Sequence, residues 1–293
     1  MTGVQTCALP IFSQADKNLI KVLREKQASG NQTEISPINN QSLLYYNSVN
    51  LAVGKQGSGK SLLFLREIMN IQNEKNIHLF IYVTPNGDIN DSTMLAIKPC
   101  LTVPLLVVSE EDLQEVVEGI VNLKNIYNDM VRDGMVDKLD PEQKEEILSL
   151  LHLEEFPSDM YNTRLHTLLL FDDAAFSSLF KKDDSYFNKF ITRCRHNNFI
   201  VIFATQKFKG LSMPVKSQAT TVMIYKGFTP QEVSYIFHNA TINGFSYQEF
   251  KELYARLEQD QVLYCNSQSG QMRIIDLSHI RALVHNPQVR SEH

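Results

Sequence analysis

The chain has 293 residues, of which 43% are hydrophobic and 21% charged, and its net charge is −5. A chain of this length can bury a sizeable core, as one large domain or two small ones. No apolar run approaches the roughly 20 residues of a spanning helix, so we expect a soluble protein without membrane contact. The four cysteines lie far apart, which fits a reducing compartment and argues against a zinc site.

Charge is distributed unevenly along the chain. Residues 110–160 hold fifteen acidic and four basic residues, whereas residues 193–226 hold six basic residues and no acidic one. One surface could therefore attract phosphates while another repels them. Two ordinary solvated faces would produce the same pattern.

Residues 1–41 are expected to lie outside the folded domain. Residues 1–11 lack the basic start and long apolar core of a signal peptide. They resemble a translated sequencing adaptor, and a natural disordered tail is the alternative. A short polar helix over Asp16–Gln27 and a linker rich in Ser, Asn and Gln complete this segment.

The stretch Val49–Ser61 (VNLAVGKQGSGKS) joins a short apolar run to G-x-x-x-x-G-K-S, and the helix-forming segment Leu62–Asn70 follows. Strand, glycine-rich turn and helix in this order predict a P-loop, whose backbone N–H groups and helix N-terminus bind phosphates. Lys60 would reach the β- and γ-phosphates of ATP, and Ser61 would hold Mg²⁺. An ordinary strand-to-helix turn is the alternative. The predicted nucleotide-binding residues are Gly54, Lys55, Gln56, Gly57, Ser58, Gly59, Lys60 and Ser61.

The remaining apolar runs predict an α/β domain over residues 42–280. Strands alternate with helical segments, which favours right-handed crossovers and a mainly parallel sheet flanked by helices. Pro104 interrupts one run and suggests an edge strand. An acidic helical insertion is expected at about 110–162, and residues 281–293 read as a loose tail. The expected strands are Ile77–Val83, Leu101–Val108, Leu165–Phe171, Phe199–Thr205 and Thr221–Tyr225, with a terminal β-hairpin of Gln261–Cys265 and Met272–Ile275.

Helix starts are marked by capping patterns. Ser109–Asp112, Asp140–Gln143, Thr229–Glu232 and Ser246–Glu249 each place a capping residue and acidic or amide side chains at the start of a helical pattern. A further helix is expected over Phe187–Arg195.

Three polar side chains follow buried strands that should end at the same edge of the sheet as the P-loop. Asp172 and Asp173 follow one strand, and Gln206 follows another. Asp172 would hold Mg²⁺ in the Walker B role, Asp173 would polarise the attacking water, and Gln206 would sense the γ-phosphate. The alternatives are an Asp pair that caps the next helix and a plain polar residue at a strand end.

Basic residues surround the Phe199–Thr205 strand. Arg193 and Arg195 precede it, and either could act as an arginine finger on the nucleotide of an adjacent subunit. Each could equally be a solvated helix arginine. Three lysines follow the strand in a loop suited to gripping a phosphate backbone, namely Lys207, Lys209 and Lys216.

Taken together, these motifs resemble the genome-packaging ATPases of poxviruses, other large DNA viruses and their smaller relatives, within the FtsK/HerA superfamily. The likeness covers roughly Leu43–Ile275. The segments that carry it are Gly54–Ser61, Tyr82–Pro85, Leu169–Asp173, Arg195–Asn198 and Ala204–Gln206, of which the last two are the most selective.

The resemblance implies a RecA-like P-loop NTPase core and a homo-oligomeric ring that drives double-stranded DNA into a preformed capsid, with a capsid or portal protein as a partner. It implies ATP and Mg²⁺ as ligands, with an arginine near position 195 acting between subunits. It also implies action at the site of virion assembly in the host cell, in the cytoplasm or a viral factory. Many superfamily members carry glutamate where Asp173 stands.

Two other functions remain open from the sequence. A nucleotide or small-molecule kinase also uses a P-loop, although no arginine-rich lid stands out. An ATP-gated assembly or scaffold protein would bind ATP with little turnover, and the presence of Asp173 argues against it.

Overall fold

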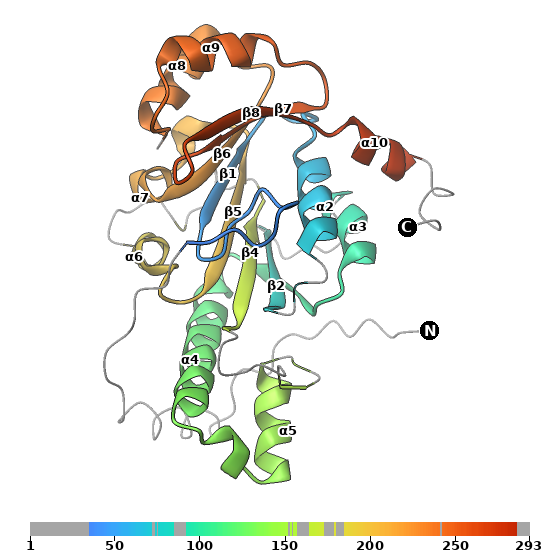
Figure 1. Cartoon of the computed structure of the whole chain (residues 1–293), viewed down its shortest axis with the longest axis vertical. Coiled ribbons are helices and arrows are strands. Elements are labelled where there is room, and N and C mark those ends of the chain that lie inside the picture. The colour runs from blue at the N-terminus through green and yellow to red at the C-terminus, as the bar shows by residue number, and fades with distance from the viewer. Residues whose placement is uncertain are drawn as a thin grey trace.

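One eight-stranded sheet carries helices on both faces (Figure 1). The computed structural model describes residues 35–71, 74, 76–84, 92–151, 153, 155–156, 164–172, 179, 185–240 and 242–285. The polar helix expected over Asp16–Gln27 lies outside these residues, and so does Asp173.

The strand order across the sheet is β3-β2-β4-β5-β1-β6-β7-β8. Strands β1 to β6 run parallel, and β7 and β8 add an antiparallel hairpin. The mainly parallel sheet, the hairpin and the edge position of the strand after Pro104 are therefore confirmed. The strands are β1 (Val49–Val53), β2 (Ile77–Thr84), β3 (Leu105–Ser109), β4 (His166–Phe171), β5 (Phe199–Thr205), β6 (Ala219–Tyr225), β7 (Gln261–Asn266) and β8 (Gln271–Asp276).

The α-helices are α2 (Lys60–Ile71), α3 (Ser92–Ile97), α4 (Leu113–Arg132), α5 (Pro141–Leu150), α6 (Tyr186–Arg193), α7 (Met213–Ser217), α8 (Pro230–Asn239), α9 (Tyr247–Ala255) and α10 (Ser278–His285). Three of the predicted starts are reciprocal capping boxes, at Asp140, Thr229 and Ser246. Asp112, by contrast, makes no side-chain cap bond at the start of α4. The sequence did not predict α3 or α7.

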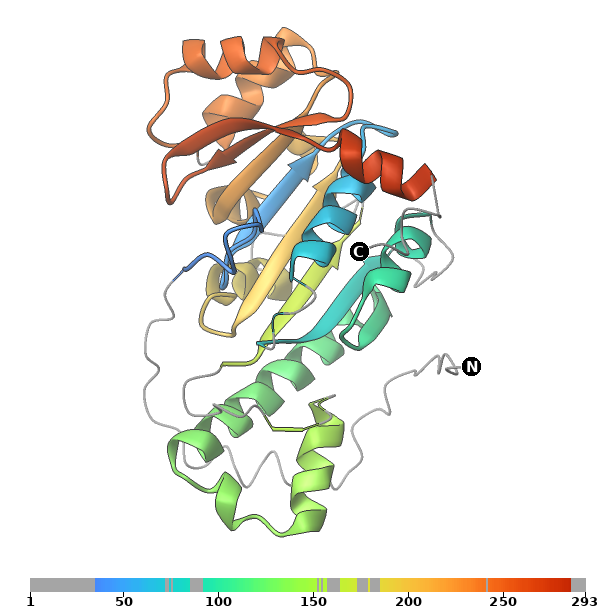
Figure 2. The same cartoon turned by 45° about the vertical axis from the view of Figure 1, so that its right-hand side comes forward.

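The core has two layers because side chains alternate across the sheet. In β1, Leu51 and Val53 face α4 and α6 to α9, and Ala52 faces α2 and α3. Every residue of β1, β2, β4, β5 and β6 is buried, as is typical of parallel strands covered on both faces. Figure 2 shows this three-layer arrangement from the side, with the carboxyl ends of the parallel strands at one edge.

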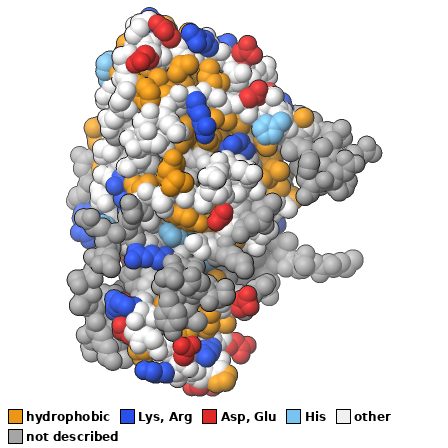
Figure 3. All heavy atoms as spheres, in the orientation of Figure 1, with side chains coloured by type: hydrophobic (Ala, Val, Ile, Leu, Met, Phe, Trp, Pro, Cys, Tyr) orange, Lys and Arg blue, Asp and Glu red, His pale blue; other side chains and the backbone are white. Residues whose placement is uncertain are grey.

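The helical insertion expected from residue 110 begins later in the structure. Leu113, Val117 and Ile120, in the first half of α4, pack into the core on the sheet. The second half of α4 forms a separate small cluster around Tyr127 with α5 and its flanking residues. This outlying end shows acidic and basic side chains side by side (Figure 3), so its local acidity does not form a continuous negative face in that view.

The described part of the expected N-terminal linker packs against α2. Ile38 and Leu43 are buried in the core. Glu67 of α2 accepts the Leu43 N–H and the Ser42 hydroxyl, both at 2.8 Å, and it pairs with Arg66. Burial raises the pKa of Glu67, and the Arg66 charge opposes that rise. The core therefore begins before Gln41.

The expectation of a loose tail from residue 281 is wrong for residues 281–285, which belong to α10 (Ser278–His285). Leu277 and Ile280 are buried, and the Leu277 N–H donates to the Asp260 carbonyl at 2.8 Å. Helix α10 lies beside α2 near the edge where β1 ends (Figures 1 and 2).

A fully buried lysine joins α4 to the sheet. The Lys124 ammonium donates to Thr167 Oγ1 at 3.1 Å and to the Asn198 carbonyl at 2.9 Å, and it lies 3.8 Å from the centre of the Phe199 ring. Burial lowers the pKa of Lys124 well below its ordinary value. The pKa of the neighbouring His166 falls to about 3, mainly through burial and then through the Lys124 charge.

The described cysteines are packed thiols. Cys100, Cys194 and Cys265 form no disulfide. Burial raises the pKa of Cys194 and of Cys265 to about 12, which keeps both in the unreactive thiol form. None of the described helices has the length and apolar character needed to cross a bilayer.

Candidate nucleotide-binding site

The loop between β1 and α2 has the backbone form that a phosphate-binding turn requires. Gly57 and Gly59 adopt positive φ angles of 72° and 98°, which glycine tolerates best. At Gly54 a Cβ atom would lie 2.8 Å from the Tyr225 ring, so only glycine fits there. Helix α2 has no acidic residue in its first turn. Its positive end therefore stands open to an anion.

Lys60 begins α2 and folds back over the loop. Its ammonium donates to the Gly54 carbonyl at 2.7 Å and to the Lys55 carbonyl at 3.2 Å. The loop is further closed by the Ser58 N–H, which donates to the Lys55 carbonyl at 3.1 Å. The ammonium thus already lies at the mouth of the loop, where phosphate oxygens would replace carbonyl oxygens as acceptors.

Tyr225, at the end of β6, holds the loop from the neighbouring strand. Its hydroxyl donates to the Gly59 carbonyl at 3.1 Å, and its own carbonyl accepts the Tyr254 hydroxyl at 3.2 Å. Burial raises the pKa of Tyr225 well above its ordinary value, so the hydroxyl remains a donor. Sequence reasoning missed this residue, because a tyrosine ending an apolar strand looks like an ordinary core residue.

Asp172 lies where β4 ends, half-buried at the same edge. Its carboxylate oxygen Oδ2 accepts the hydroxyl of the buried Tyr82 at 2.9 Å, and its N–H donates to the Val83 carbonyl at 3.2 Å. Both bonds fix the carboxylate against β2. Tyr82 belongs to a segment that carries the family resemblance, but the sequence analysis gave it no role in the site.

Gln206 follows β5, which lies between the strand of the phosphate loop and the strand of Asp172. The Gly54 N–H donates to the Thr205 carbonyl at 3.0 Å, which ties the end of β5 to the loop. The register pairs Thr205 with Val53 on one side and Phe203 with Phe171 on the other. Gln206 is half-buried and lies between the loop and Asp172 along this edge.

Arg193 and Arg195 are at the opposite edge of the sheet. Arg193 is exposed in the last turn of α6, and Arg195 is half-buried in the turn that leads into β5. The seven residues of β5 separate that turn from the loop, a span of about 20 Å. These arginines therefore do not meet the phosphate loop of their own chain.

The three lysines after β5 differ in environment. Lys207 and Lys209 are exposed around a short 3-10 turn, Phe208–Gly210. Lys216 is only 3% exposed, and its ammonium lies 5.3 Å from the Phe208 ring centre and 5.6 Å from that of Tyr235. The expected phosphate contact by Lys216 is thus wrong for this structure, because its ammonium is packed beneath the short turn at Phe208–Gly210.

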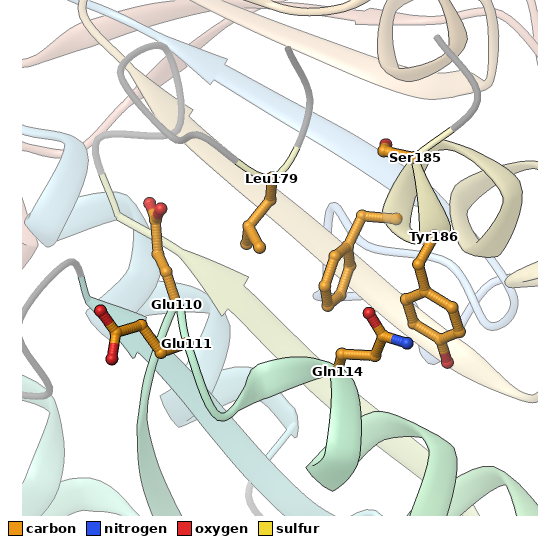
Figure 4. Close-up of a pocket in the computed structure, with 7 residues that line it drawn as sticks. Glu110, Glu111, Gln114, Leu179, Ser185 and Tyr186 are labelled. Atoms are coloured by element: carbon orange, nitrogen blue, oxygen red, sulfur yellow. The ribbon is translucent and has the colours of Figure 1, made fainter. Parts of the chain in front are cut away.

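A hollow of about 410 Å³ opens beyond this edge, between the starts of α4 and α6 (Figure 4). Glu110, Glu111 and Gln114 line it from α4 and the preceding turn, and the Gln114 side chain lies opposite Tyr186. No residue of the phosphate loop lines it. Its carboxylates would repel a triphosphate, so this hollow is a poorer candidate for the nucleotide site than the phosphate loop.

The residues at the loop fit a magnesium ion that is shared with a nucleotide. Mg²⁺ prefers oxygen ligands and takes few of them from the protein, because water and phosphate supply the rest. Ser61 offers a hydroxyl at the start of α2, and Asp172 offers a carboxylate anchored by Tyr82. The described residues contain no cluster of three His, Cys, Asp or Glu side chains that would form a metal site without nucleotide.

Comparisons with known proteins identify the fold. No protein-family model matches the chain, and no curated protein matches it. Among solved structures, the genome packaging NTPase B204 of Sulfolobus turreted icosahedral virus 2, in complex with AMPPCP, is similar at a TM-score of 0.50 and 18% identity, covering 78% of this chain and 96% of that one. The pCW3 conjugation coupling protein TcpA, with ATPγS, has a TM-score of 0.48 and 11% identity over 94% of this chain and 87% of that one. The first likeness, the sheet order and the loop together show a RecA-like P-loop NTPase fold.

Proposed function

We propose that this protein hydrolyses ATP to move double-stranded DNA, and that its task is to package a viral genome. The observation that carries the ATPase part is the meeting of the phosphate loop, Asp172 and Gln206 at one edge of the sheet. Such an edge, at the carboxyl ends of parallel strands, is where ligands bind in open α/β sheets. The DNA part is supported by the motif resemblance, by the exposed Lys207 and Lys209, and by the similarity to B204, a genome packaging NTPase.

Each residue of the edge has a role in phosphoryl transfer. Lys60 would bind the β- and γ-phosphates in place of its present carbonyl partners. Ser61 and Asp172 would hold Mg²⁺, which when bound neutralises charge on the phosphate oxygens. Gln206 would orient the attacking water or contact the γ-phosphate, and Asp173 would polarise that water.

The position of the arginines supports a shared site between subunits. Arg193 and Arg195 lie about 20 Å from the loop of their own chain, so they can act on a nucleotide only from a neighbouring molecule. In a ring of identical subunits the contacts are head-to-tail, so a different face of one subunit can meet the loop of the next. We infer a homo-oligomeric ring with a capsid or portal protein as its docking partner at the site of virion assembly.

ATP turnover measured with and without duplex DNA tests the proposal. We expect duplex DNA to stimulate turnover, and Lys60→Ala to abolish it. Turnover that is lost in Lys60→Ala but indifferent to DNA would leave an ATPase without a DNA function.

The same preparations separate the rival functions. Phosphate transfer to an added nucleoside monophosphate would identify a kinase. Assembly that depends on ATP without turnover, seen by size-exclusion chromatography, would identify a nucleotide-gated scaffold.

A further inference from the structure

Arg281 of α10 brings a second cation to the phosphate loop. A Cβ atom placed on Gly59 would lie 4.0 Å from Nη2 of Arg281. The Leu62 and Tyr225 side chains approach the same point, at 3.6 and 3.7 Å. The guanidinium therefore lies at the flank of the glycine that directly precedes Lys60.

Asp260 holds this guanidinium in place. The Arg281 Nη2 atom pairs with the Asp260 carboxylate, whose side chain is only 12% exposed. Asp260 adopts a positive φ of 61° at the turn before β7, and its carbonyl accepts the Leu277 N–H just before α10. The fold thus fixes the acid and the helix together, so that Arg281 points toward the loop.

The pair leaves part of the guanidinium unused. Arg281 Nε is buried and has no hydrogen-bond partner among the described residues, whereas arginine carries five N–H donors. The Arg281 side chain is 34% exposed, so an entering ligand can reach it. Nη2, the atom beside Gly59, has one carboxylate partner, and a partly exposed guanidinium can take further acceptor oxygens from an anionic ligand at the loop.

We propose that Arg281 contacts the phosphates of the bound nucleoside triphosphate from within the same subunit, and that Asp260 holds it ready when the site is empty. This inference rests on the proposed nucleotide binding. A triphosphate carries more charge and more acceptors than one carboxylate, so the guanidinium gains contacts when the nucleotide enters. Nucleotide binding would then also fasten α10 against α2.

Titration of the full-length protein with ATP and Mg²⁺, by calorimetry, tests the contact. Loss of one charge-assisted phosphate contact should weaken binding about 10- to 100-fold in Arg281→Ala. Arg281→Lys should recover part of this loss. The matched control is Arg256→Ala, an exposed arginine at the end of α9, which should bind ATP like the wild type.

A paired variant guards against a folding artefact. Arg281→Ala alone leaves the Asp260 carboxylate without its ion-pair partner. Asp260→Asn combined with Arg281→Ala removes both charges, and asparagine tolerates the positive φ at position 260. The double variant should melt near the wild-type temperature and show the same loss of ATP affinity.

Inorganic tripolyphosphate distinguishes a phosphate contact from a base contact. In competition with ATP, its affinity should fall in Arg281→Ala by a factor similar to that for ATP, and an unchanged value would overturn the assignment to phosphates. If the folded double variant bound ATP within twofold of the wild-type affinity, the inference about Arg281 would be overturned, and the proposed function would still stand. If the wild type bound no ATP and matched Lys60→Ala, the proposed function itself would fall, and this inference with it.

Discussion

The hydroxyl of Tyr225 provides a direct test of how the phosphate loop is held. It donates to the Gly59 carbonyl at 3.1 Å from a buried position at the end of β6. Tyr225→Phe removes this donor and keeps the ring that closes on Gly54. Because the pKa of Tyr225 is raised by burial, the hydroxyl stays protonated and the effect should be constant between about pH 6 and 9.

The magnitude follows from the partners of the Gly59 oxygen. That oxygen also accepts the N–H groups of Leu62 at 3.0 Å and Leu63 at 3.2 Å, so the substitution does not leave it unpaired. The cost is then that of one ordinary hydrogen bond, about 1 kcal/mol. For a domain of this size the melting temperature should fall by about 2–4 °C. If the whole of this free energy is lost from the loop conformation that binds ATP, ATP binding should weaken by up to about fivefold.

Tyr264→Phe is the matched control, measured by thermal unfolding and ATP titration. The Tyr264 hydroxyl donates to the Leu43 carbonyl at 3.2 Å and accepts Asn266 Nδ2 at 2.9 Å, and neither partner belongs to the loop. Its loss should cost at least as much stability and leave ATP affinity unchanged. An equal loss of affinity in both variants would show that binding follows global stability, which refutes the reasoning about the loop.

Three further predictions concern the core, the metal ligand and the subunit interface. Lys124→Met should make stability less dependent on pH. Because burial lowers the folded pKa of Lys124, wild-type stability falls as pH drops from about 10.4 toward that lowered pKa, and urea unfolding across the range should show the variant free of this loss. Asp172→Asn should keep ATP binding but lose most Mg²⁺-dependent turnover, and full turnover at saturating Mg²⁺ would contradict the metal role. Mixing Lys60→Ala with Arg195→Ala should restore turnover that each lacks alone, and no recovery in mixed oligomers would count against an arginine acting between subunits.

The sheet could be predicted from the sequence because its strands are short apolar runs that end in recognisable turn residues. Phe199–Thr205 is found with the predicted bounds, and β1 begins at the expected Val49. Such strands are buried on both faces, so their apolar character does not depend on any distant contact. The capping boxes of α5, α8 and α9 could be predicted for a similar reason, since each is a local pair of hydrogen bonds between two residues three positions apart.

The parts of the site that were missed depend on contacts between distant segments. Tyr225 lies 166 positions from Gly59 along the chain, and Tyr82 lies 90 from Asp172. Tyr225 carries no local pattern that distinguishes it from a core residue, and the motif segment that begins at Tyr82 does not indicate which distant side chain its hydroxyl contacts. For Lys216 the sequence led to the opposite error, because a site role was predicted for a side chain that is buried. Its neighbours in the sequence gave no sign that Phe208 and Tyr235 would cover its ammonium. Asp173 remains a prediction, since it lies outside the described residues.

The phosphate loop contacts the ends of β5 and β6 and the start of α8. The Gly54 N–H is bonded to the end of β5, and the Gly59 carbonyl to the end of β6. Lys55, within the loop, lies 3.8 Å from the Glu232 carboxylate of α8 and 5.6 Å from the Phe228 ring centre. The Lys55 pair is exposed and therefore weak, so a bound triphosphate can draw that lysine away at little cost. Nucleotide occupancy would then release Lys55 from Glu232 and leave α8 and α9 packed on the core, while β5 and β6 keep the loop itself in place.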